Sequence, residues 1–120
     1  MVKTYNIIRK VEDSTEFEEF FLGKVLPLIF KTKSRQVKVT KVVPLMKKQD
    51  EMLEGIQYII ESYYDSLEVV DETVHSEEGL EVMKASSQMP GELSVFIAQE
   101  KFIQSPKNDP FDREKPIKRF

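Results

Sequence analysis

One carboxylate in the sequence lies inside a segment that is otherwise dominated by apolar and aromatic residues. The stretch GIQYIIESYY, residues 55–64, is dense in β-branched and aromatic residues and predicts a strand that contains Glu61. Because side chains alternate along a strand, Gln57, Ile59, Glu61 and Tyr63 share one side of it. A carboxylate on such a surface must find a hydrogen-bond donor or take up a proton. Glu61 and Tyr63 are therefore the candidate catalytic residues.

Two roles are open to Glu61. It can handle a proton in a pocket whose polar wall includes Gln57 and Tyr63. Alternatively, it can form a salt bridge across a dimer interface to a lysine or arginine of the partner. We favour the interface role over the catalytic one.

Other residue types that carry chemistry are sparse. His75 is the single histidine, and its place at an expected helix junction is explained by capping or exposure. No histidine or carboxylate follows it four residues later to complete a metal site. The chain has no cysteine, which excludes disulfides, a thiol nucleophile and thiolate metal ligands. We therefore expect no metal and no cofactor.

The apolar stretch FFLGKVLPLIF, residues 20–30, combines a glycine with a proline four residues later. Pro27 cannot donate a hydrogen bond to the carbonyl four residues back, and its ring crowds that carbonyl. That carbonyl belongs to Gly23, which has no Cβ and tolerates a distorted helix. The pair predicts a bend, which either wraps the helix around a sheet or opens it to admit a ligand.

The expected elements follow the order strand, helix, strand, strand, helix, strand. Asp13, with Glu16 three residues on, resembles a capping box at the start of the first helix. Asp65 is expected to cap the second helix, which should break near His75. The predicted strands cover residues 3–10, 35–43, 55–64 and 92–102, and the predicted helices begin at residue 13 or 14 and at residue 65. This order indicates a ferredoxin-like α+β domain over residues 1–102, with a four-stranded antiparallel sheet and both helices on one face.

This arrangement leaves the second face of the sheet bare. The strand at 55–64 carries large apolar groups on both of its sides, among them Tyr58 and Ile60 on one and Ile59 and Tyr63 on the other. A second copy of the same sheet is the simplest cover for such a face. We therefore expect a homodimer formed through the open sheet face. Tyr5 could line either the core or a cleft, because alternation alone does not settle which side is which.

Two segments resemble a known family. The segment YIIESYYDSLEVVDETVHSEEGLEVMKASSQM and the stretch EFEEFFLGKVLPL are similar to the EthD-like members of the dimeric α/β-barrel superfamily, and the similarity spans roughly residues 3–100. The resemblance implies a ferredoxin-like fold whose sheets pair face to face into a barrel. It also implies a cleft between sheet and helices that accepts small, largely apolar molecules. Related barrels include monooxygenases and enzymes of aromatic polyketide tailoring, many of which work without metal or flavin.

The chain departs from the family at one position. Where the family often has histidine before x-Pro-Leu, this chain has Val25, followed by Leu26, Pro27 and Leu28. Valine cannot transfer a proton, so chemistry that depends on that imidazole is absent.

Two hypotheses follow from the resemblance and the departure. One is a cofactor-independent oxidoreductase, monooxygenase-like or tailoring enzyme acting on a small apolar or aromatic metabolite. The other is a non-catalytic dimeric barrel that binds a hydrophobic ligand or serves as an assembly module. The residues expected to contact a ligand are Gln57, Ile59, Glu61, Tyr63, Val25 and Tyr5.

Composition excludes several classes of partner. The formal charge is −3, whereas a phosphate-binding protein usually has a basic excess, so no nucleic acid is expected. The apolar runs fall far short of the ~20 residues that a membrane span needs. The N-terminus lacks the features of a secretory signal, which together with the absence of cysteine predicts a cytoplasmic protein. Residues 103–120 form a polar, proline-containing tail that is either docked or mobile.

Overall fold

The fold is that of a ferredoxin-like α+β protein. A computed structural model describes residues 1–43, 45 and 55–105. Its strands are β1 (Val2–Arg9), β2 (Gln36–Lys41), β3 (Ile56–Tyr64) and β4 (Glu92–Gln99); its helices are α1 (Ser14–Phe20), the π-helical turn η1 (Phe21–Val25), α2 (Leu26–Ile29), α4 (Leu67–Val74) and α5 (Glu77–Ser86). The four strands form one antiparallel sheet in the order β2-β3-β1-β4. The predicted fold class and order of elements are confirmed.

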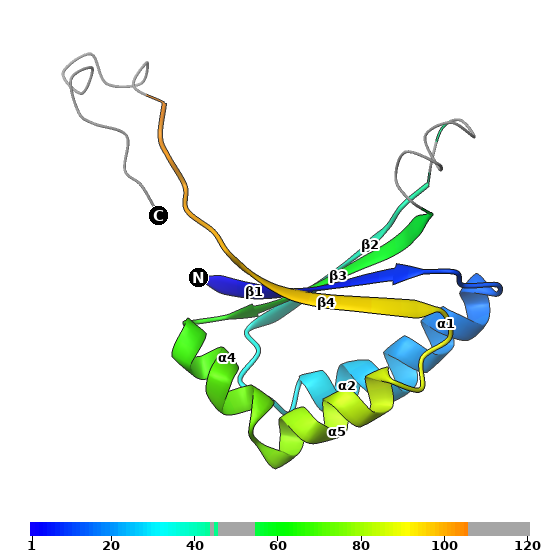
Figure 1. The fold of residues 1–120 in the computed structure, drawn as a ribbon, viewed down its shortest axis with the longest axis horizontal. Helices are drawn as coiled ribbons and strands as arrows, with labels where there is room; N and C mark the ends of the chain where they lie inside the picture. The colour runs from blue at the N-terminus through cyan, green and yellow to red at the C-terminus, as the bar shows by residue number, and fades with distance from the viewer. Residues whose placement is uncertain (44, 46–54, 106–120) are drawn as a thin grey trace.

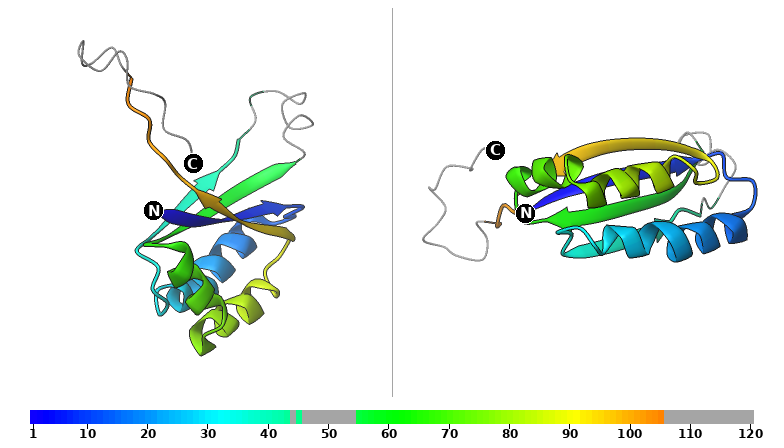
Figure 2. Two further views of the ribbon diagram at one scale, coloured as in Figure 1. Left: turned by 60° about the vertical axis from the view of Figure 1, so that its left-hand side comes forward. Right: turned by 90° about the horizontal axis from the view of Figure 1, so that it is seen from below.

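The helices among the described residues all cover one face of the sheet, and they leave the opposite face open (Figure 1). Two rows of helix, α1–η1–α2 and α4–α5, lie along the covered face (Figure 2). Cross-strand partners share a face, and Ile8 pairs with Tyr58, both of which are buried in the core beneath the helices. The alternate pair, Tyr5 with Glu61, therefore belongs to the open face.

The main core lies between the sheet and the first helical row. Phe17, Phe21, Val25 and Ile29 recur every four residues and are all buried against the sheet. The ring of Phe17 stacks on that of Tyr58 with centroids 4.4 Å apart. Phe20 and Leu28 also lie at helical spacing from these residues in the sequence, but both are only half-buried.

The helix is irregular at Gly23 and Pro27, where the sequence predicted a bend, and it forms a wide turn there. The N–H of Leu26 donates to the carbonyl of Phe21, five residues back, which is the hydrogen bond of a π-helix. The π-helical hydrogen bonding ends at Pro27, which has no backbone N–H and so cannot donate the next hydrogen bond. A Cβ at Gly23 would meet nothing within 4 Å, so space does not demand glycine at this position.

The helix ends agree with the sequence at two of the three sites that it indicated. Asp13 accepts hydrogen bonds from the first turn of α1, and α4 ends before His75, as the sequence indicated; Ser76 then caps α5. The prediction for Asp65 is wrong: Ser66 caps α4 by accepting from the N–H of Val69 at 3.2 Å. The Asp65 carboxylate instead binds the guanidinium of Arg35 at 3.0 Å. Within the described part of the chain, no helix has the length and apolar character needed to cross a bilayer.

Candidate functional site

Glu61 lies at the centre of the open face and is already paired within its own chain. Its residue surface is only 6% exposed. The Nζ of Lys3 donates to its Oε1 at 2.9 Å, and the Nζ of Lys38 lies 3.8 Å from its Oε2. Lys3 also forms an ion pair with Glu100, just beyond the end of β4. The two strands beside β3, with the residue after β4, therefore supply the charges that surround this carboxylate.

Aromatic rings frame the same charges. The Lys3 ammonium lies 4.7 Å from the ring centroid of Tyr5 and 5.5 Å from that of Tyr63, within the range of cation–π attraction. The Tyr5 ring in turn stacks on Phe96 of β4 at 5.0 Å. We call Lys3, Tyr5, Glu61 and Tyr63 the Lys3–Glu61 cluster. It is an ion pair held between aromatic rings on the helix-free side of the sheet.

The electrostatics of the cluster fix both charges. Burial pushes the pKa of Glu61 upward, but hydrogen bonds from Lys3 and Tyr5 and the charges of Lys3 and Lys38 outweigh it, so the net pKa lies below the ordinary glutamate value. Hydrogen bonds to Glu100, Tyr5 and Glu61 raise the pKa of Lys3 against the opposing effect of burial. At neutral pH the carboxylate is ionised and the ammonium is charged. Neither group is poised to exchange a proton near pH 7.

The six residues expected to contact a ligand lie in different parts of the structure. Tyr5, Glu61 and Tyr63 meet in the cluster, and Ile59 lies half-buried on the same side of β3. Gln57 instead binds the backbone that follows β1. Its side-chain amide accepts a hydrogen bond from the N–H of Val11 and donates one to the Val11 carbonyl.

The structure differs most from the sequence-based prediction at Val25 and Lys3. Val25 is buried in the core on the opposite side of the sheet from the cluster. Lys3, the central residue of the cluster, was missed by sequence reasoning. Its signal was its position two residues before Tyr5 on β1, which places both side chains on one face.

The covered face holds one polar group of interest, the hydroxyl of Tyr58. Tyr58 is fully buried and its hydroxyl has no hydrogen-bond partner among the described residues. A buried hydroxyl without a partner costs about 1–3 kcal/mol. This oxygen is therefore a polar atom of the helix–sheet interior that the described residues leave unsatisfied.

Replacing Tyr58 with phenylalanine tests this assignment. We expect the variant to gain about 1 kcal/mol in free energy of unfolding, because it removes the unsatisfied group and keeps the ring against Phe17. Urea denaturation followed by circular dichroism measures the change. A loss of stability would mean that the hydroxyl has a partner in solution.

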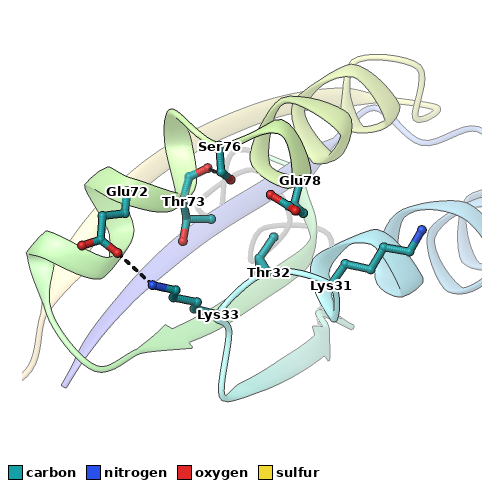
Figure 3. Close-up of a pocket in the computed structure, with 7 residues that line it drawn as sticks. All are labelled: Lys31, Thr32, Lys33, Glu72, Thr73, Ser76 and Glu78. Atoms are coloured by element: carbon teal, nitrogen blue, oxygen red, sulfur yellow. Dashed lines mark hydrogen bonds and ion pairs between the residues drawn. The ribbon is translucent and has the colours of Figure 1, made fainter.

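A shallow hollow of about 250 Å³ lies between the turn after α2 and the corner of α4 and α5 (Figure 3). Its lining side chains are all polar: Lys31, Thr32, Lys33, Glu72, Thr73, Ser76 and Glu78. Lys33 and Glu72 form an ion pair across it at 3.0 Å. Such walls suit water and ions better than an apolar molecule. Sequence reasoning did not find this hollow, because its walls come from segments about 40 residues apart that only the fold brings together.

No histidine or acid cluster offers a metal centre within residues 1–43, 45 and 55–105. His75 is exposed, and its Nδ1 lies 2.8 Å from the carbonyl oxygen of Asp71 in the preceding turn. It is a residue of the helix corner rather than of the cluster.

These features define a ferredoxin-like sheet with one helical layer and a charged, aromatic centre on its open face. The chain is similar to an ethyl tert-butyl ether D (EthD) family protein from Bacillus halodurans, with a TM-score of 0.72 and 26% sequence identity, covering 84% of this chain and 99% of that one. The resemblance to EthD-like proteins that the sequence indicated is confirmed. A scan against protein-family models and a search of curated proteins both gave no match.

Two further solved structures share the fold at lower identity. One is the hydroxynitrile lyase of Passiflora edulis, with a TM-score of 0.64 and 17% identity over 84% of this chain and 95% of that one. The other is a dimeric protein of unknown function and ferredoxin-like fold from Bacteroides fragilis, with a TM-score of 0.54 and 13% identity over 82% of this chain and 95% of that one.

Proposed function

We propose that this protein is a homodimeric EthD-like α/β barrel that binds a small, largely apolar molecule without using Glu61 for proton transfer. The observation that carries the proposal is the open face itself. Its centre is an ion pair whose charges are already satisfied within one chain, and around it lie aromatic and aliphatic side chains that no described helix covers. A surface of this kind is suited to enclosure by a second sheet rather than to open water.

The chemistry of the open face supports a homodimer. Phe96 is 46% exposed, and Tyr5, Ile7, Ile59 and Tyr63 are each half-buried on the same side. Sheets that pack face to face lie about 10 Å apart, which lets side chains of both layers interdigitate. A neighbour of the same fold is described as dimeric. In such a dimer the two Lys3–Glu61 clusters would face a shared interior.

Binding is better supported than catalysis at this face. The Glu61 carboxylate accepts from Lys3 and has a lowered pKa, so it is a weak base at neutral pH. Val25 stands where related proteins often have histidine, and it is packed into the core. The tyrosine rings and Ile59 offer apolar contacts, while the paired charges offer a fixed polar anchor. A structure of protein purified from its native source would reveal a bound molecule between the sheets.

A charge placed at Phe96 tests the interface. We expect Phe96→Asp to make the protein monomeric, because an unpaired carboxylate would be buried between the two sheets. The neighbouring variant Val95→Asp is the matched control: Val95 is 61% exposed on the same strand but points to the helix side. Sedimentation velocity over a range of concentrations measures the outcome. Equal association of both variants would contradict an interface on the open face.

A second candidate function is an EthD-like enzyme that works on the covered side of the sheet. Two observations favour it: the 26% identity to an EthD family protein and the unpartnered hydroxyl of Tyr58 in the helix–sheet interior. The Tyr58→Phe experiment described above tests the premise of this second candidate. An unchanged or increased stability leaves the hydroxyl free for a substrate, and a decreased stability assigns it to the fold.

A further inference from the structure

The chain continues beyond β4 as an extended arm, which we define as residues 100–105. The arm leaves the sheet on the side opposite the helices, as both views in which the helices lie below the sheet show (Figures 1 and 2). Phe102 is 90% exposed, and Ile103 beside it is exposed as well. Two adjacent large apolar side chains therefore project away from the protein's own core.

The root of the arm is held in place by the Lys3–Glu61 cluster. Glu100, its first residue, forms an ion pair with the buried ammonium of Lys3. Lys3 is itself fixed by Glu61 at 2.9 Å on the neighbouring strand β3. The start of the arm is thus tied to the centre of the sheet.

We propose that the arm reaches across to a second copy of the chain and that Phe102 packs on that copy. The inference rests on the homodimer proposed above. At about 3.3 Å per residue, an extended arm of this length spans about 20 Å, twice the ~10 Å that separates two packed sheets. A second sheet packed on the open face therefore lies within reach of the arm.

A second copy fits this geometry better than another partner does. A two-fold axis through the open face makes the contact reciprocal, so each copy's arm covers the other and no apolar arm is left over. Phenylalanine is a large apolar side chain whose burial contributes strongly to association.

Substitution of the exposed phenylalanine tests the energetic role of the arm. We expect Phe102→Ser to raise the dimer dissociation constant at least about tenfold, since each dimer loses two buried rings. Phe30→Ser is the matched control, because Phe30 is 58% exposed at the end of α2 on the helix side. Sedimentation equilibrium of the full chain gives both constants. Equal constants for the variant and the wild type overturn the inference and leave the dimer intact, whereas a monomeric wild type overturns the dimer itself.

A cross-link tests which copy the arm touches. A benzophenone-bearing phenylalanine analogue is placed at position 102, and 15N-labelled and unlabelled chains are mixed, irradiated and digested for mass spectrometry. Cross-linked peptides that join labelled to unlabelled chain support the inference. Cross-links confined to one chain, or none at all, overturn it.

Discussion

Replacing Lys3 with methionine is expected to destabilise the protein by about 3 kcal/mol, because it leaves the buried carboxylate of Glu61 without its nearest cation. The Glu61 side chain is 8% exposed, so solvent offers little compensation. Lys38 remains, but its Nζ is 3.8 Å from the carboxylate and its side chain is largely exposed. Urea denaturation at pH 7 measures the loss. The double variant Lys3→Met with Glu61→Gln should recover most of it, since the amide carries no charge to bury.

The same substitution should reverse the response to acid. In the wild type the pKa of Glu61 is lowered, so its contribution to stability is complete above about pH 4.3, the ordinary glutamate value, and is lost as the pH falls through the folded-state pKa. The raised pKa of Lys3 gives a contribution that is complete below about pH 10.4 and is lost as the pH rises through its folded-state pKa. Without Lys3, burial raises the pKa of Glu61, and the free energy of unfolding should increase as the pH falls from about 7 to about 5. A variant that keeps the wild-type acid response would contradict the assigned ion pair.

A methyl group added at Gly79 should cost about 3 kcal/mol of stability. A Cβ there would lie 1.8 Å from the carbonyl oxygen of Thr73 and 2.8 Å from its carbonyl carbon. That carbonyl already accepts hydrogen bonds from the N–H and the hydroxyl of Ser76, so it cannot move without breaking the α4–α5 corner. Gly79→Ala should therefore open the corner that lines the polar hollow. Urea denaturation provides the measurement.

Gly23→Ala is the control for this prediction. An added Cβ at Gly23 meets nothing within 4 Å, so alanine should be neutral or stabilise by about 0.5 kcal/mol through the unfolded chain. If Gly79→Ala and Gly23→Ala unfold at the same urea concentration, the close approach of the helices at Thr73 is not rigid.

The order of elements could be predicted because each segment carries a local sequence signal for its own type of secondary structure. The density of β-branched and aromatic residues in Ile56–Tyr64 and the apolar residues spaced three or four apart after Asp13 are local signals that packing did not override. The open face followed from that order alone. These signals act within one segment, and they also placed Tyr5, Glu61 and Tyr63 on strands that the fold brings together.

What sequence reasoning missed depends on partners far along the chain. Glu61 was expected to find a cation in another copy, but Lys3 of the same chain, 58 residues earlier and one diagonal step across the neighbouring strand, pairs with it. Asp65 and Ser66 are both residue types that cap helices. Arg35, 30 residues earlier, binds Asp65, and Ser66 caps α4. Which partner a side chain binds depends on the residues that come within its reach in the folded state. The spacing of residues within one segment does not encode this.

The π-helical turn has a consequence for how the first helical row meets the sheet. In a regular α-helix each step of four residues overshoots a full revolution by about 40°, so three steps would rotate the last side chain by about 120°. Phe17, Phe21, Val25 and Ile29 nevertheless all point into the core. The extra residue taken up at Phe21–Val25 offsets roughly 100° of that drift. Phase along the helix is thus tied to the wide turn: the same residues in an unbroken α-helix would swing Ile29 by about 120° towards water, whereas deleting one residue within Phe21–Val25 would let the turn close as a regular α-helix and leave Ile29 only about 20° out of phase with Phe17.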